Sequence, residues 1–238
     1  MILHGTNLEF TLAKKNILIW DIPVRIFHWA LVICLIGAWY TSEGERGLID
    51  IHLLFGYSIL ALVLFRIFWG FIGTKYAKFS HFIPTPTAIK LYLTGKNKFH
   101  LGHNPLGSLM VFFMLALLLL QAISGLFMSD EIFTNGPYFD SVSKNIQQLM
   151  STIHHTAFDI IVIVSTLHIG AIFYYLLVKK QNLITAMFTG KQWVEDKLRG
   201  LSIKHSKLVT ACILLVLVCT FVYWLVVLNV PIEEEYYY

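Results

Sequence analysis

The sequence predicts an all-α integral membrane protein with five membrane-spanning helices. Of its 238 residues, 57% are hydrophobic and only 13% are charged, a balance too apolar for a soluble domain of this length. The apolar residues are also gathered into long runs, and a bilayer core needs about 20 mostly apolar residues per helix. Five runs are long enough, namely residues 24–41, 51–73, 107–128, 153–178 and 208–230.

The segments around these runs are polar. A segment containing Lys14, Lys15 and Asp21 precedes the first run, and because no small-residue cleavage site with the usual flanks follows that run, we expect no removable signal peptide. The connection 74–106 after the second run is long enough for a short interfacial helix. No soluble second domain and no internal repeat is evident in the sequence.

Positive charge predicts how the chain threads the membrane, because cytoplasmic loops are enriched in Lys and Arg. All of the 18 basic residues except Arg46 and Lys144 fall on one side of the alternating spans. The N-terminus is therefore expected in the cytoplasm and the C-terminus in the periplasm. The same distribution explains the net charge of +4 without a nucleic-acid partner.

Histidines sort by their position relative to the spans. A loop histidine needs no functional explanation, and five of the ten are in the tail or in loops: His4, His81, His100, His103 and His205. An ionisable residue inside a span is costly and usually functional. The other five are in spans: His28, His52, His154, His155 and His168.

The fourth span holds three of these histidines. At 3.6 residues per turn, His154 and His168 lie about 40° apart on one helix face and roughly 21 Å apart along the axis. His155 is about 140° away from His168. Of the adjacent pair, His154 is therefore the residue that shares the face of His168.

Depth in the membrane selects partners for these two histidines. The first span runs outward and the second and fourth run inward, so His52 is level with His154 near the outer side. His28 is level with His168 near the cytoplasmic side. The sequence thus predicts two histidine pairs at two depths.

Two facing imidazoles without a carboxylate or thiol suit a transition metal. Zinc requires four ligands per site, whereas two histidines match the two axial positions of a haem iron, and helix bundles commonly hold such cofactors in their interior. We therefore predict two non-covalent haems b. The cysteines, Cys34, Cys212 and Cys219, all lie within spans and no C-x-x-C-H motif occurs, which argues against a disulfide framework, a zinc site and covalently attached haem.

Two other uses of the histidines stay open. They can hydrogen-bond between helices, as polar groups in spans often do, or they can form a proton relay with Asp159. Asp159 is about 140° from His154 around the helix, so it is off the predicted haem face. It can pair with His155 or face a wet pocket near the outer surface.

Four motifs resemble one family. WDIPVRIFHW at 20–29, HLLFGYSILALVLFRIFWG at 52–70, GHNPLG at 102–107 and the spacing H-x13-H from His154 to His168 are similar to the bacterial cytochrome b561 family, which includes nickel-iron hydrogenase b-type cytochromes. The resemblance covers about residues 18–192. It implies a four-helix transmembrane bundle holding two haems b, with His28, His52, His154 and His168 as ligands.

The resemblance also implies a domain organisation. Residues 24–192 form the four-helix domain, between a cytoplasmic segment 1–23 and a cytoplasmic linker 193–207. Residues 208–238 depart from the four-helix core of the family. They add a fifth transmembrane helix without a histidine, which packs against the bundle or docks a partner, and an acidic outside tail, PIEEEYYY. Further residues match motif positions without an assigned role: Trp29, Arg66, Trp69, Asn104 and Pro105.

The function implied is electron transfer across the bacterial inner membrane, between the quinone pool of a respiratory chain and a periplasmic cytochrome c or hydrogenase-like enzyme. In this scheme Arg25 and Arg66 pair with the propionates of the inner haem. Whether the chain turns over quinol itself is left open by its sequence. The alternatives are a haem-containing membrane anchor or assembly subunit, and a proton-linked transporter that uses the same histidines.

Overall fold

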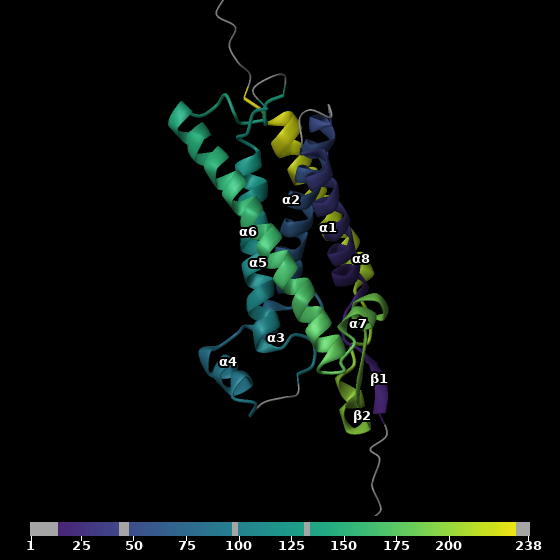
Figure 1. The fold of residues 1–238 in the computed structure, drawn as a ribbon. Helices are drawn as coiled ribbons and strands as arrows, with labels where there is room; N and C mark the ends of the chain where they lie inside the picture. The colour runs from purple at the N-terminus through teal and green to yellow at the C-terminus, as the bar shows by residue number, and fades with distance from the viewer. Residues whose placement is uncertain (1–13, 43–47, 97–99, 131–133, 232–238) are drawn as a thin grey trace, which may run out of the picture.

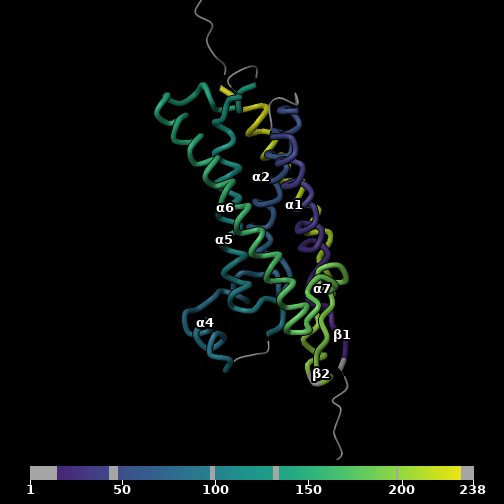
Figure 2. The backbone as a smooth tube through the Cα atoms, in the orientation of Figure 1, coloured from purple at the N-terminus to yellow at the C-terminus, as the bar shows by residue number. Residues whose placement is uncertain are grey.

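Five long helices run side by side in an elongated bundle (Figures 1 and 2). The computed structural model describes residues 14–42, 48–96, 100–130 and 134–231. The helices that are long and apolar enough to cross a membrane are α1 (Ile22–Thr41), α2 (Ile49–Ile72), α5 (Pro105–Gly125), α6 (Lys144–Leu177) and α8 (Leu208–Tyr223) with its π-helical continuation η3 (Trp224–Leu228). All five predicted spans are confirmed.

The fourth span is longer than its apolar run. Helix α6 begins at Lys144 rather than at residue 153, after Ser143 as its N-cap. Its first turns contain polar residues such as Gln147 and Gln148, which hydropathy alone does not assign to a span. The helix therefore extends beyond the apolar part of the sequence.

The smaller elements lie together at one end of the bundle, at the bottom of Figure 1. We call this the basic end, because the loops there contain most of the Lys and Arg residues. Its elements are β1 (Lys14–Leu18), α3 (Phe79–Phe82), α4 (Pro86–Leu93), α7 (Leu183–Thr189), β2 (Lys191–Glu195) and the 3-10 helix η2 (Asp196–Leu201). Helices α3 and α4 provide the short helix expected in the connection 74–106.

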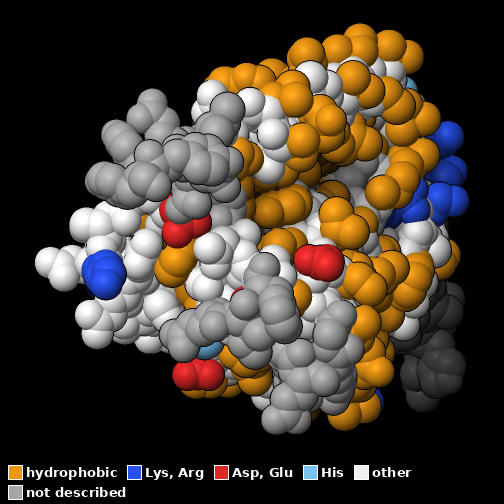
Figure 3. Space-filling model, turned by 90° about the horizontal axis from the view of Figure 1, so that it is seen from above, with side chains coloured by type: hydrophobic (Ala, Val, Ile, Leu, Met, Phe, Trp, Pro, Cys, Tyr) orange, Lys and Arg blue, Asp and Glu red, His pale blue; other side chains and the backbone are white. Residues whose placement is uncertain are grey.

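The opposite end is called the acidic end. Figure 3 looks onto it and shows scattered acidic side chains on the end itself and hydrophobic side chains along the flank. Asp50 and Asp140 belong to this end, with Lys144 at the start of α6. Three positions used in the sequence argument lie outside the described residues: His4, Arg46 and the acidic tail beyond residue 231.

A two-stranded antiparallel sheet at the basic end was not predicted. Strand β1 pairs with β2, with Lys15 opposite Val194. The backbone N–H of Leu18 donates to the hydroxyl of Ser202 over 3.1 Å, and that of Ile22 donates to the hydroxyl of Ser206 over 3.2 Å. The segment before α8 is therefore fastened to the segment before α1.

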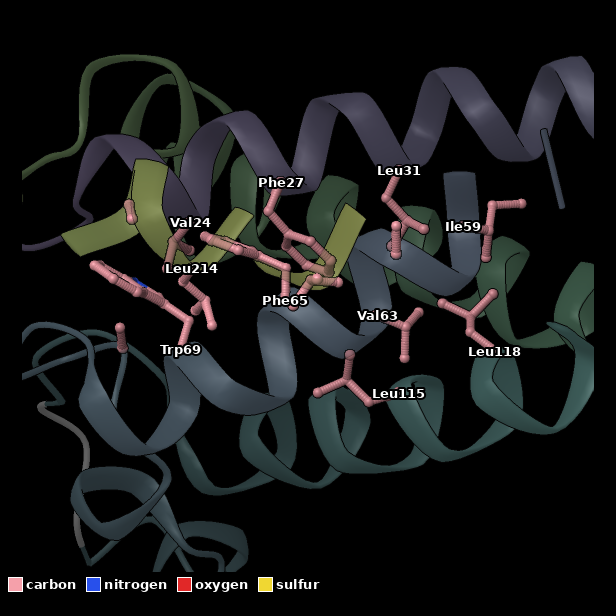
Figure 4. Close-up of a cluster of buried hydrophobic side chains, with 14 of the residues drawn as sticks. Val24, Phe27, Leu31, Ile59, Val63, Phe65, Trp69, Leu115, Leu118 and Leu214 are labelled. Carbon is pink, nitrogen blue, oxygen red and sulfur yellow. The ribbon is translucent and has the colours of Figure 1, made fainter. Parts of the chain in front are cut away.

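The apolar core lies where α1, α2, α5 and α8 meet. Figure 4 shows Phe27 and Leu31 of α1 facing Val63 and Phe65 of α2, with Leu118 of α5 beneath them. Helix α2 is central, because it packs against α1, α5 and α8. Within a bilayer, where lipid tails are as apolar as these side chains, the contacts stabilise the bundle mainly through close van der Waals packing.

Helix α6 is held mainly by α5 and α7. Its buried residues are Ala157, Ile161 and Val164, and most of its other side chains are exposed or half-buried. The two histidines of its predicted haem face therefore border a side of α6 that the polypeptide covers incompletely.

Two of the sequence motifs mark helix starts. Asp21 is the N-cap of α1, and its Oδ1 accepts a hydrogen bond from the backbone N–H of Val24 over 2.7 Å. Asn104 is the N-cap of α5, and its Oδ1 accepts from the N–H of Gly107 over 2.8 Å. Each cap is followed by proline in the first turn, where the missing N–H has no cost. WDIP and HNPLG are thus start signals for spans.

Candidate functional site

The histidines predicted to pair at the outer depth lie together in the structure. His52 of α2 and His154 of α6 have ring centroids 6.5 Å apart with ring planes at 77°. Two imidazoles that bind one metal ion from opposite sides at about 2.0 Å have centroids roughly 6 Å apart. The observed separation fits a shared metal ion between the two rings.

A hydrogen bond orients the ring of His52. Its Nδ1 is 2.8 Å from the backbone oxygen of Ala38, so Nδ1 carries the proton and donates it to this carbonyl. The tautomer leaves Nε2 unprotonated, as metal binding requires. One turn further along α2, a Cβ on Gly56 would meet nothing within 4 Å, so there is open space next to His52 on its helix face.

The ring of His154 is held by α5. Its Nδ1 is 3.1 Å from the backbone oxygen of Gln121 and 3.2 Å from the hydroxyl of Ser124. Its Nε2 is 3.1 Å from the side-chain nitrogen of Gln121. Because the carbonyl takes the Nδ1 proton, Nε2 accepts from the amide of Gln121. A metal ion bound at Nε2 would replace this amide as the partner of the ring.

Glycine permits this close approach between α5 and α6. A Cβ on Gly125 would lie 3.0 Å from Cε1 of His154. The sequence reasoning missed Gln121, Ser124 and Gly125, although the signal was available: Gln121 and Ser124 are polar residues within an apolar span, and such residues are usually interhelical partners.

The histidines predicted to pair at the inner depth are also neighbours. His28 of α1 and His168 of α6 are close enough to interact electrostatically. The ring of His28 packs edge-on against Trp29, with centroids 5.0 Å apart. Its Nδ1 is buried and has no hydrogen-bond partner among the described residues. Buried imidazole nitrogens usually have a hydrogen-bond partner, so the environment of His28 is compatible with the binding of a further group.

The remaining polar residues of α6 lie outside the two pairs. The side chains of His155 and Asp159 are exposed, and the ring of His155 is 6.2 Å from that of His154. Within the part of the chain that the structure describes, no group of three or more His, Cys, Asp and Glu side chains could hold a metal ion. The described histidines therefore offer pairs rather than a four-ligand centre.

A buried carboxylate organises the basic end. Asp21 is 1% exposed, and its Oδ2 accepts from the indole N–H of Trp69 over 3.1 Å and from the hydroxyl of Thr74 over 2.5 Å. Its charge interacts with the guanidinium of Arg66, which is 3% exposed and lies 5.0 Å from the ring centre of Phe79. Asp21 thus links the start of α1 to the end of α2, a role that we did not predict.

The two arginines expected to meet haem propionates have protein contacts as well. The Nη1 of Arg25 donates to the backbone oxygen of Phe188 over 2.5 Å, at the last turn of α7, where cations are favoured. Its Nε, and the Nη1 of Arg66, are buried without a hydrogen-bond partner among the described residues. Each guanidinium therefore retains donors for a further anion.

The loop histidine His103 is packed rather than freely solvated. Its ring lies 4.6 Å from that of Trp20 and 4.3 Å from that of Phe82, measured between centroids. The pKa of His103 is lowered to about 3, mainly by burial and to a smaller extent by the positive charges of Arg66 and His81. From the sequence, His103 was expected to be a loop residue without a special role. Its packing against aromatic residues that are distant in the chain cannot be recognised from the neighbouring sequence.

This shift predicts a pH dependence of stability. In the unfolded state the histidine has a pKa near 6.5, so below pH 6.5 the unfolded state binds a proton that the folded state does not bind. The free energy of unfolding is therefore highest above pH 6.5 and falls as the pH drops. Between pH 6 and pH 4 the loss should be roughly 2.5 kcal/mol. His103→Gln should flatten this part of the profile, measured as the thermal unfolding midpoint against pH in detergent, whereas an unchanged slope would contradict the assignment.

A tyrosine pair joins α4, α5 and α6 near the same end. The side-chain nitrogen of Asn104 donates to the hydroxyl of Tyr175 over 2.8 Å, and the hydroxyls of Tyr175 and Tyr92 share a hydrogen bond. Asn104, a motif residue without an assigned role in the sequence, therefore caps α5 and anchors α6 at once.

Comparison with known proteins matches residues 19–190 to the family described as prokaryotic cytochrome b561. A probable Ni/Fe-hydrogenase B-type cytochrome subunit of Rhizobium leguminosarum bv. viciae is 24% identical over 233 residues, covering 82% of this chain and 95% of that protein. A probable subunit of the same kind from Rhodobacter capsulatus is 23% identical over 227 residues, covering 80% and 86%. With five apolar helices and a family match over most of its length, this chain belongs to the prokaryotic cytochrome b561 family.

Proposed function

We propose that this protein transfers electrons across a bacterial inner membrane between the quinone pool and a periplasmic redox partner, using two haems b. His52 and His154 hold the outer haem, and His28 and His168 hold the inner one. Family membership supports a b-type membrane cytochrome that binds haem b. The single observation that supports two sites is the pairing of the four histidines at two levels of α6.

The chain's own residues prepare the ligands. The carbonyl of Ala38 fixes the tautomer of His52, and the carbonyl of Gln121 does the same for His154. Such hydrogen bonds orient an imidazole and raise its basicity as a ligand. Haem iron supplies reversible one-electron chemistry, while the protein supplies ligands, orientation and a low dielectric.

The orientation in the membrane follows from the loop charges. The basic end faces the cytoplasm and the acidic end faces the periplasm, so the N-terminus is inside and the C-terminus outside. The periplasmic partner then meets the acidic end, near the His52 and His154 pair. Relatives named as hydrogenase cytochrome subunits support a hydrogenase-like enzyme as partner, and a periplasmic cytochrome c is the other candidate.

Two parts of the chain have separate roles in this proposal. Residues 24–192 form the cytochrome domain, and α8, beyond the linker 193–207, packs against α2 at its side.

Because the relatives are named as subunits, a second candidate function is a haem-containing membrane anchor or assembly subunit without quinone turnover of its own.

The haem content and its reactivity test the proposal. We expect the pyridine haemochrome spectrum of the purified protein to give two haems b per chain. A quinol analogue should reduce them, and a periplasmic fraction should reoxidise them. Haems that stay inert to quinol support the anchor, and a protein without a Soret band rejects both functions.

The propionate proposal makes a separate prediction. Arg25→Gln removes the unpartnered Nε donor at the basic end and should shift the midpoint potential or lower the occupancy of the inner haem only, because a positive charge near a propionate stabilises its anion. Potentiometric titration of the Soret band resolves the two haems. Lys180→Gln serves as the control for a lost charge at the same end. Unchanged inner-haem potential and occupancy in the Arg25 variant would exclude this role.

A further inference from the structure

A basic pocket opens at the end of the bundle, away from the histidine pairs. Its volume is about 390 Å³. It lies where α2 ends, where the turn before α3 begins and where α8 starts. The lining residues are Gly73, Thr74, Lys75, Lys78, Ser80, His81 and Lys207.

The lining is positively charged. Lys75, Lys78 and Lys207 contribute three ammonium groups, and no carboxylate is among the lining residues. Burial first, and then the charge of Lys75, lower the pKa of His81, so at neutral pH its ring is an uncharged hydrogen-bonding group. The carboxylate of Asp21, which contacts the lining residue Thr74, is buried and already accepts from the hydroxyl of Thr74 and from the indole N–H of Trp69.

One of the three ammonium groups is held in place by hydrogen bonds. The Nζ of Lys207 donates to the backbone oxygens of Ile72 and Gly73 over 3.0 and 3.1 Å, at the carbonyl end of α2. An ammonium has three donors, so one donor of Lys207 is left for a ligand. The Nζ of Lys75 lies 5.3 Å from the ring centre of Tyr76. Ordered donors lose less side-chain entropy on binding than mobile surface lysines do.

The pocket lies at the level where two spans leave the apolar layer. Its neighbours on the chain include large hydrophobic side chains that are exposed: Phe71 and Ile72 at the end of α2, and Leu208 and Val209 at the start of α8. Helices α2 and α8 pack together, so these side chains flank the pocket on the side of the membrane. A ligand here meets cations at one end and an apolar surface at the other.

We propose that this pocket binds the phosphate head group of an anionic phospholipid, with the acyl chains along the apolar ends of α2 and α8. Basic pockets between transmembrane helices recognise anionic head groups by charge. The hydroxyl of Ser80 and the ring of His81 add hydrogen-bond donors to the three ammonium groups. A free phosphate shares the head-group chemistry, but the exposed apolar side chains favour a lipid.

The test uses the full-length protein in detergent and a fluorescent phosphatidylglycerol as the probe. Lys75→Gln with Lys78→Gln should lower its affinity about 30-fold, since each lysine near the membrane surface contributes roughly a five-fold factor. The matched control is Lys179→Gln with Lys180→Gln, which removes the same charge at the same end outside the pocket. Its affinity should stay within about two-fold of the parent protein. An unchanged Soret band confirms that both variants are folded.

Competition identifies the source of the phosphate. Unlabelled phosphatidylglycerol should displace the probe, whereas phosphatidylcholine and millimolar inorganic phosphate should not. An equal loss of affinity in the two double variants would overturn the proposal, because binding would then depend on diffuse surface charge. Displacement by inorganic phosphate as effective as displacement by the anionic lipid would also overturn it, since the pocket would then be a soluble-anion site.

Discussion

His154→Ala should leave one haem b per chain instead of two. The substitution removes one of two predicted axial ligands of the outer haem, and the alanine methyl group cannot bind iron. The facing ring of His52 then has no partner across the site, while His28 and His168 on the same bundle are untouched. The pyridine haemochrome, measured together with far-ultraviolet circular dichroism, reports haem loss and helix content separately.

The adjacent histidine provides the control. His155→Ala should keep two haems, because the side chain of His155 is exposed and lies beside, not between, the paired rings. The two variants differ by one position and remove the same group. If His155→Ala lost the haem and His154→Ala kept it, the helix phase assigned to α6 would be wrong by one residue.

Local properties of the sequence predicted the spans and the histidine pairs. An apolar run of the right length is sufficient to indicate a transmembrane helix, and helical periodicity placed His154 rather than His155 on the face of His168. The antiparallel topology of neighbouring spans then set the depth of each histidine. These steps need no knowledge of side-chain packing, which is why the neighbours in each pair could be named.

Contacts between distant residues could not be predicted in this way. Asp21 meets Trp69 and Thr74 only because the start of α1 lies against the end of α2. The pairing of β1 with β2 joins the segment before α1 to a segment before α8, and each strand has only five residues, too few to show a clear strand pattern. The interhelical contact of Gln121 could have been predicted, because a single amide side chain in an apolar span usually has a hydrogen-bond partner on another helix.

Asp21→Asn should lower the free energy of unfolding by about 3 kcal/mol. The carboxylate caps α1 through Val24, accepts from Trp69 and Thr74, and is the buried counter-charge of Arg66. Hydrogen bonds to a charged acceptor are worth roughly 1.5–3 kcal/mol each, so loss of the charge weakens all three bonds and removes the attraction to Arg66, while the amide oxygen keeps part of the bonding. In a chain of this size the thermal midpoint should fall by roughly 6–12 °C.

Asp140→Asn is the matched control, since Asp140 is an exposed loop carboxylate that accepts from Asn135, and its effect should stay within about 0.5 kcal/mol.

The loss of stability caused by Asp21→Asn should also be compared between haem-loaded and haem-free protein. If a propionate is a second anion beside Arg66, whose Nη1 is buried without a partner among the described residues, Asp21→Asn should destabilise the haem-free protein more. Equal losses in both forms would mean that Asp21 is the counter-ion on which Arg66 depends, and that the inner haem propionates bind elsewhere.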